Sequence, residues 1–112
     1  MTDCLFCKIR DGEIPAEVIY KDDDCLAFRD INPKAPVHFL VIPRRHIENL
    51  LDTTPADEGL LGRIQLKISQ IAKEQGLDSG FRTVLNTGPG GHQEVYHMHY
   101  HVLGGGPFTG FN

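Results

Sequence analysis

The clearest pattern of hydrophobic and polar positions lies in the middle of the chain, between residues 54 and 76. Apolar residues recur there at helical spacing, whereas Lys67 and Lys73 fall on other faces. Thr54 offers an N-cap before Pro55, and Gly76 supplies the left-handed residue that commonly ends a helix. This pattern predicts one long amphipathic helix whose core-facing stripe consists of Leu60, Leu61, Ile64, Ile68, Ile71 and Ala72.

Five shorter segments are rich in the β-branched, aromatic and other apolar residues that favour strands. They span residues 17–21, 25–28, 37–42, 81–85 and 95–103. An acidic turn at residues 22–24 joins the first two segments, and residues 5–10 form a short helix that ends before Gly12. Together the elements predict an α+β fold, in which a five-stranded antiparallel sheet carries one long helix and a short N-terminal helix. Residues 104–112 are Gly-rich and are expected to be irregular.

Composition narrows what such a fold can do. The 112 residues, 40% hydrophobic and 23% charged, fit one domain over residues 1–112. A formal net charge of −4 argues against a broad surface for nucleic acid or for an anionic membrane. No window approaches the about 18 consecutive apolar residues of a membrane span, and Asp3, Lys8 and Arg10 make the start of the chain polar. We expect a cytoplasmic protein with no nucleic-acid or membrane partner.

Three histidines alternate in the last predicted strand. Alternate side chains of a strand share a face, so His97, His99 and His101 would line one side about 7 Å apart. That separation is too large for all three to bind one metal ion and favours separate roles. A neutral imidazole is a competent nucleophile near pH 7 and can carry a phosphoryl or nucleotidyl group until water removes it. The Gly-rich residues 88–91 that precede the histidines match neither the Walker nor the dinucleotide pattern, but a phosphate-binding role suits their position.

Residues 97–103, His-Met-His-Tyr-His-Val-Leu, resemble the signature of the histidine triad (HIT) family, His-x-His-x-His followed by two apolar residues. The likeness extends through residues 28–33, 38–43 and 86–88 and ends at Gly104-Gly105. Within the family, the chain looks most like the Hint branch, the purine nucleoside phosphoramidate hydrolases. The resemblance implies hydrolysis of a P–N bond through a nucleotidyl-histidine, with a purine nucleotide as ligand and no catalytic metal.

The resemblance also implies roles for individual residues. His99 would be the nucleophile, His101 would contact the phosphate and assist the leaving group, and His38 would support the hydrogen-bond network. Asp30 matches the aspartate that binds the ribose hydroxyls. The other implied nucleotide-binding residues are Phe6, Ile9, Phe28, Ile31 and Leu40 around the base, and Asn86, Gln93, Glu94 and Val95 around the phosphate.

Glu94 departs from the Hint branch, which usually has serine or threonine two residues before the position of Tyr96. A carboxylate near a phosphate repels it, unless the side chain turns outward or pairs with a cationic amine leaving group. Two alternatives therefore stay open: a dinucleoside polyphosphate hydrolase, and a catalytically weak, nucleotide-binding regulatory dimer.

The resemblance implies homodimers that pair the long helix and the fourth strand, and Leu66 lies off the core-facing stripe of that helix.

Cys4 and Cys7 supply half of a tetrahedral zinc site. His46 and His97 are candidates for the other two ligands, and some HIT proteins that this chain resembles hold zinc with residues at these four positions. We expect a structural zinc ion that leaves the second and third histidines of the triad for chemistry. A redox role for the Cys-x-x-Cys segment is less favoured, because no strand precedes it and no long helix follows it. Cys25 is expected to be a small buried residue.

Overall fold

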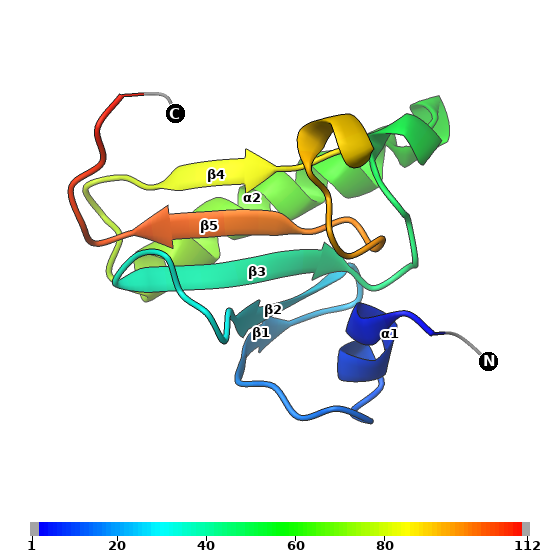
Figure 1. Ribbon diagram of the computed structural model, residues 1–112, viewed down its shortest axis with the longest axis horizontal. Coiled ribbons are helices and arrows are strands. Elements are labelled where there is room, and N and C mark those ends of the chain that lie inside the picture. The colour runs from blue at the N-terminus through cyan, green and yellow to red at the C-terminus, as the bar shows by residue number, and fades with distance from the viewer. Residues whose placement is uncertain (1–2, 111–112) are drawn as a thin grey trace.

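Five antiparallel strands form one sheet in the computed structural model, which describes residues 3–110 of the chain (Figure 1). In sheet order the strands are β1 (Val18–Lys21), β2 (Cys25–Arg29), β3 (Val37–Pro43), β5 (Tyr100–Gly104) and β4 (Arg82–Leu85). Helix α1 (Leu5–Arg10) precedes the sheet, and helix α2 (Glu58–Glu74) connects β3 to β4. The predicted α+β architecture is confirmed.

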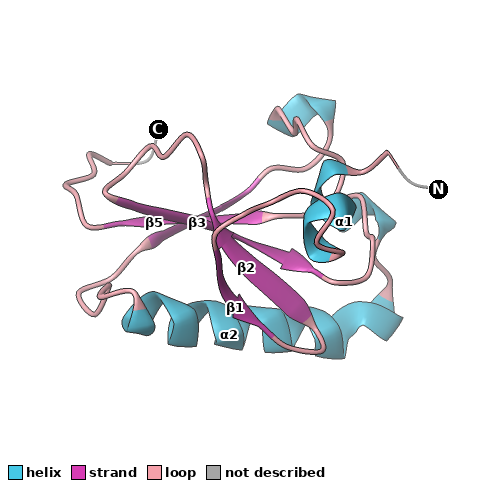
Figure 2. Ribbon diagram, turned by 90° about the horizontal axis from the view of Figure 1, so that it is seen from below, coloured by secondary structure: helices cyan, strands magenta, loops and turns pink. Residues whose placement is uncertain are grey.

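The sheet buries a different set of side chains on each face, because alternate residues of a strand point to opposite sides. Phe39 and Val41 belong to the larger core, which also contains the buried stripe of α2. Phe28 and Leu40 belong to a second, smaller cluster together with Phe6 of α1. Figure 2 shows α2 running along one face of the sheet, with α1 on the other side. The second face is therefore where a site can form between the sheet, α1 and the loops.

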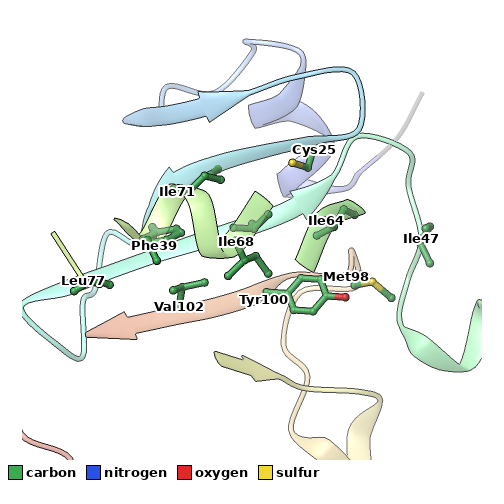
Figure 3. Packing of buried hydrophobic residues seen from close by; sticks show 13 residues of the cluster. Cys25, Phe39, Ile47, Ile64, Ile68, Ile71, Leu77, Met98, Tyr100 and Val102 are labelled. Carbon is green, nitrogen blue, oxygen red and sulfur yellow. The ribbon is translucent and has the colours of Figure 1, made fainter. Parts of the chain in front are cut away.

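Helix α2 packs through the stripe that its spacing predicts. Its buried residues are Ile64, Ile68, Ile71 and Ala72, and the three isoleucines belong to one cluster with Phe39, Tyr100 and Val102 of the sheet (Figure 3). Thr54 and Asp57 form a capping box around a 3-10 turn, Pro55–Asp57, so the α-helix proper begins at Glu58. Gly76 has the expected left-handed conformation, with φ of 84°. Leu66, off the stripe, is 75% exposed.

The last strand is shorter than the alternating pattern predicts. The expectation of a strand over residues 95–103 is wrong for its first half, because pairing with β3 and β4 begins only at Tyr100. Before Tyr100 the chain bends, and the Met98 side chain enters the core beside Ile47 while its N–H donates to the Ile47 carbonyl over 2.7 Å. The three histidines therefore do not share one face of one strand; His101 alone lies on β5.

The other predicted elements need little correction. Helix α1 matches residues 5–10, and β1 to β4 agree with their predicted ranges to within one residue at each end. The Asp22 carboxylate accepts the N–H groups of Asp24 and Cys25, which explains the acidic turn. Gly104 was expected to be irregular but is the last residue of β5, because it pairs with Val37 of β3. Residues 105–110 are irregular as expected, and residues 111–112 of that prediction lie outside the described residues. Within residues 3–110, no helix has the length and apolar character needed to cross a bilayer.

Candidate functional site

A cavity of about 330 Å³ opens on the α1 side of the sheet. It lies between α1, the end of β2, and the loop that leads into β5. The structure brings together in its lining most of the residues assigned to nucleotide binding: Phe6, Ile9, Phe28, Asp30, Ile31, Leu40, Asn86, Glu94, Val95, His99 and His101. His38 lies directly behind His101, and the Gln93 side chain is buried in the loop instead of lining the cavity.

One part of the cavity is apolar and suited to a flat ring. Phe6 and Phe28 meet edge to face with ring centroids 5.5 Å apart, and Leu40 is buried beside them. Ile31 is 89% exposed. Aromatic and aliphatic walls of this kind favour the insertion of another apolar ring.

His99 has its reactive nitrogen defined by a backbone contact. Its Nδ1 lies 2.8 Å from the carbonyl oxygen of His97, and because a carbonyl only accepts, Nδ1 carries the proton. The Nε2 atom therefore keeps its lone pair. Burial lowers the pKa of His99, and the charges of Asp30 and Glu94 oppose that shift only in part. His99 is thus a neutral imidazole with an unprotonated Nε2, the form that a nucleophile needs.

His101 has the opposite proton arrangement, which a chain of hydrogen bonds imposes. The backbone N–H of Lys34 donates to His38 Nδ1 over 3.0 Å, so the His38 proton lies on Nε2. His38 Nε2 is 3.0 Å from His101 Nδ1 and donates to it, which leaves the His101 proton on Nε2. Burial lowers the pKa of His38 and lowers that of His101 to about 4. The ring centroids of His99 and His101 lie 5.0 Å apart. The site therefore holds an unprotonated Nε2 on His99 close to an N–H donor, Nε2–H of His101.

Asp30 anchors the polar side of the cavity at the end of β2. One oxygen accepts the N–H of Asn32 over 2.8 Å, and the other lies 3.4 Å from His38 Nε2. Glu94, in contrast, is 82% exposed, and its nearest ion-pair partner is the exposed His92 ring at 3.9 Å. Glu94 therefore brings a negative charge to the cavity without a fixed cation beside it.

Sequence reasoning assigned Gln93 to the phosphate and missed the part that its side chain plays in shaping the loop before β5. The Gln93 amide group donates to the carbonyls of Glu48 and Val95, and its oxygen accepts from Gly88 N–H and from the Asn49 amide. These four contacts hold residues 48–49 against residues 88–95. Asn49 carries no sequence signal of its own, because its partner Gln93 lies 44 residues away in the chain. The Lys34 amide carries none because every residue except proline has a backbone N–H.

A second group of side chains, the Cys–His cluster, consists of Cys4, Cys7, His46 and His97. Their donor atoms all lie within 4.8 Å of one another. His97 Nδ1 lies 3.3 Å from Cys4 Sγ, 3.4 Å from Cys7 Sγ and 3.2 Å from His46 Nδ1. A tetrahedral zinc ion, with bonds of about 2.1 Å to nitrogen and 2.3 Å to sulfur, places neighbouring ligand atoms about 3.3 to 3.8 Å apart. The residues therefore fit a metal ion, and the predicted ligand set is brought together.

The elements that position this cluster come from both ends of the chain. Cys4 is the N-cap residue of α1 and Cys7 lies in its first turn. His46 follows β3, and the Nε2–H of His97 donates to the Pro43 carbonyl over 2.8 Å. Because that contact fixes the proton on Nε2, His97 Nδ1 presents its lone pair to the other three ligands.

The fold and the pair of neutral histidines, His99 buried and His101 half-buried, indicate a protein that performs chemistry at a small-molecule cavity. The family model for the HIT domain matches residues 11–108. The chain belongs to the HIT family, as its histidine pattern predicts.

Individual relatives agree with that assignment. An uncharacterised HIT-like protein of Synechococcus elongatus is 55% identical over 103 residues, which cover 92% of this chain and 90% of the relative. Protein HitA of Neisseria gonorrhoeae is 49% identical over 104 residues, covering 93% and 97%. Among solved structures, a HIT family hydrolase from Legionella pneumophila superposes with a TM-score of 0.93 at 49% identity, covering 96% and 97%. A histidine triad protein from Clostridium difficile gives 0.94 at 45% identity, covering 100% and 98%.

Proposed function

We propose that the protein hydrolyses the P–N bond of purine nucleoside 5′-phosphoramidates, such as AMP joined to lysine, and the acyl phosphate P–O bond of related aminoacyl adenylates. The observation that carries the proposal is the pairing of His99, with an unprotonated Nε2, and His101, with a protonated Nε2, in one cavity. The first can attack phosphorus and the second can donate to the group that leaves. The similarity to a HIT family hydrolase supports the same reaction class.

The substrate would bind with its base among Phe6, Phe28 and Leu40, because these side chains form the apolar part of the cavity. Asp30 would accept hydrogen bonds from the ribose hydroxyls. Asn86 and backbone N–H groups around residues 93–95 would hold the phosphate oxygens. This placement puts the α-phosphorus beside the two histidines.

The reaction then proceeds in two displacements. His99 Nε2 forms a bond to the α-phosphorus while the P–N bond to the amine breaks. The departing nitrogen takes a proton from water, and His101 Nε2–H donates a hydrogen bond that supports its departure; the nucleotidylated His99 ring, 5.0 Å away, then carries a positive charge. In the second displacement water attacks phosphorus, its proton returns to solvent, and the nucleoside monophosphate and neutral His99 are released.

The test is hydrolysis of an adenosine phosphoramidate by the purified protein and by a His99→Ala variant, without added metal. The unmodified protein should turn the substrate over, and the variant should lose turnover while it still binds a purine nucleoside monophosphate. That retained binding is the control for folding. Turnover that persists in the variant would rule out His99 as the nucleophile, and absence of turnover in the folded, nucleotide-binding wild type would rule out the phosphoramidase proposal.

Glu94 supports a second candidate function, a catalytically weak nucleotide-binding dimer. Its exposed carboxylate adds negative charge to the cavity in which an anionic phosphate would bind. Nucleotide binding with no loss of phosphoramidate over hours would favour this candidate. A clear preference for diadenosine tetraphosphate would instead favour a dinucleoside polyphosphate hydrolase.

We also propose that Cys4, Cys7, His46 and His97 hold a structural zinc ion. A bound zinc ion would tie α1 to the loops after β3 and before β5, because the four ligands come from those segments. A reducing compartment such as the cytoplasm would preserve the thiols, and no disulfide joins Cys4, Cys7 or Cys25. Metal analysis of the purified protein tests the proposal, and less than about a tenth of an equivalent per chain would contradict it.

The protein is further proposed to act as a homodimer through α2 and β4. β4 is an edge strand with unpaired backbone groups on one side, and the 75% exposed Leu66 gives α2 an apolar residue outside the core. Sedimentation of the purified protein at micromolar concentration should give the mass of two chains. A Leu66→Asp change should shift the equilibrium toward the mass of one.

A further inference from the structure

His97 belongs to the Cys–His cluster and to the catalytic pair at the same time. Its ring places Nδ1 among the ligand atoms of the cluster. Its backbone carbonyl accepts the Nδ1–H of His99 over 2.8 Å, the contact that leaves His99 Nε2 unprotonated. The atom that sets the tautomer of the nucleophile is therefore part of a residue whose side chain is a metal ligand.

A second connection runs through α1. Cys4 and Cys7 flank Phe6 in the sequence, and the Phe6 ring meets the His99 ring edge to face with centroids 5.0 Å apart. Phe6 also lies 6.2 Å from the His97 ring. Helix α1 has six residues, too few to be stable without tertiary contacts. The position of Phe6 against His99 therefore depends both on its packing against Phe28 and Leu40 and on what holds its neighbours Cys4 and Cys7.

The sheet does not hold this region by itself. Pairing of β5 with β3 and β4 begins at Tyr100, so the His97 carbonyl and the His99 ring lie outside the ladder. The ring of His97 is fixed instead by its bond to the Pro43 carbonyl and by the cluster. Loss of the cluster would leave the His97 ring only its bond to the Pro43 carbonyl and its edge contact with Phe6, and would remove the tie between the start of α1 and the loops after β3 and before β5.

We propose that Cys4, Cys7 and His46 are positioning residues for the nucleophile, acting through the His97 carbonyl and the Phe6 ring. With the four ligands drawn together by a metal ion, His99 is confined to one tautomer and one orientation. With the ligands separated, His99 rotates and exchanges its proton between Nδ1 and Nε2, so fewer molecules present the lone pair to phosphorus. The inference rests on the proposed function in one respect, that His99 is the nucleophile.

His46 offers the cleanest variant, because its side chain is exposed and lies outside the lining of the catalytic cavity. His46→Ala removes one ligand and should lower the catalytic rate constant on the order of tenfold or more, the usual effect of losing a supporting contact around such a site. Cys25→Ala is the matched control: Cys25 is buried in the α2 core, outside the ligand set, so the zinc content and rate constant should stay near those of wild type. Cys7→Ala should behave as His46→Ala does, and His46→Ala alone carries the test if Cys7→Ala does not fold.

The decisive measurement does not depend on turnover. NMR spectra of protein labelled with ¹⁵N-histidine report which ring nitrogen of His99 carries the proton. Wild type loaded with zinc, and Cys25→Ala, should show His99 protonated on Nδ1 alone, whereas chelated wild type and His46→Ala should show both tautomers. Adding zinc back to chelated wild type should restore the single tautomer. Because no substrate is involved, failure of the phosphoramidase proposal would leave this result intact.

A purely structural cluster gives a different pattern. His46→Ala would then lose zinc and thermal stability, yet the folded protein would keep the single His99 tautomer and a rate constant within twofold of wild type. That pattern would overturn the inference.

Discussion

Two groups of potential metal ligands lie in this structure, and they differ in what occupies their nitrogen atoms. The Cys–His cluster presents a histidine lone pair to two sulfurs, because a carbonyl outside the cluster accepts the Nε2–H of His97 and leaves its Nδ1 unprotonated. The second group, the Asp–His cluster of Asp30, His38 and His101, also places its donor atoms within 4.8 Å. There a proton lies between the two histidine rings, because the Lys34 amide occupies His38 Nδ1. Backbone groups outside each cluster thus determine whether an imidazole offers a lone pair to a metal or a proton to a substrate.

The largest expected effect comes from removing the proton donor of the Asp–His cluster. His101→Ala should reduce the rate of phosphoramidate hydrolysis by about 10²- to 10⁴-fold, the usual contribution of a positioned acid or base. Steady-state kinetics beside metal analysis checks this, since the zinc content should not change. A rate within tenfold of wild type would mean that His101 does not serve the leaving group.

Metal analysis of variants should show that the Cys–His cluster binds zinc and that the Asp–His cluster does not. Wild type should bind one equivalent of zinc, His38→Ala should bind the same amount, and Cys7→Ala should retain less than about a tenth. Inductively coupled plasma analysis after gel filtration measures all three. Two equivalents in wild type, with one lost in His38→Ala, would show that the Asp–His cluster also binds metal. The two clusters would then not differ in whether they offer a lone pair to a metal.

The same comparison predicts how stability depends on pH. Burial lowers the pKa of His101 to about 4 in the folded state, whereas an unfolded histidine titrates near 6.5. The unfolded chain therefore binds more protons between these values, and the free energy of unfolding should fall as pH falls from about 6.5 to 4. Urea unfolding at pH 7, 6 and 5 measures the slope. His101→Gln should flatten it, and a change at the exposed His92 should not; an equally steep slope in His101→Gln would contradict the assignment.

The smallest expected effect concerns Glu94. Because its carboxylate is exposed and has no fixed cation beside it, it should favour amine leaving groups that carry a positive charge. Glu94→Gln should lower kcat/KM about two- to fivefold for such a substrate relative to one with a neutral leaving group. Glu58→Gln, at the start of α2, is the control for a lost surface charge. If Glu94→Gln leaves the ratio of kcat/KM between the two substrates unchanged, Glu94 does not select the leaving group.

Local patterns predicted those parts of the fold that local forces determine. Helix α2 follows from its apolar spacing, its capping box and Gly76, all of which act within a few residues. The strand over residues 95–103 was predicted too long because an alternating pattern of side chains does not show whether a neighbouring strand pairs with every residue of the segment. The partner of this segment is set by distant residues, above all Pro43 and the ligands of the Cys–His cluster.

The candidate site was predictable to a similar extent. The family signature identified His99 and His101, and the structure places both in one cavity with Asp30 and the apolar residues assigned to the base. The tautomers were not predictable, because they depend on single backbone groups, the Lys34 amide and the His97 carbonyl. The course of the loop around Gln93 was equally hidden, since two of the four contacts of that side chain join segments more than 40 residues apart in the chain.

Gln93 also shapes how this protein can change over generations. Its buried amide fixes the course of the loop, while its neighbours His92 and Glu94 expose 89% and 82% of their side chains. Substitutions at position 94 therefore alter the charge and width of the cavity mouth without altering the backbone that carries it. At position 92 the left-handed backbone, with φ of 62°, favours replacement by asparagine, aspartate or glycine. Of three consecutive residues, the middle one fixes the loop backbone and the outer two set the charge at the cavity mouth. A library of variants at positions 92 and 94 is therefore the place to redirect the enzyme to new leaving groups.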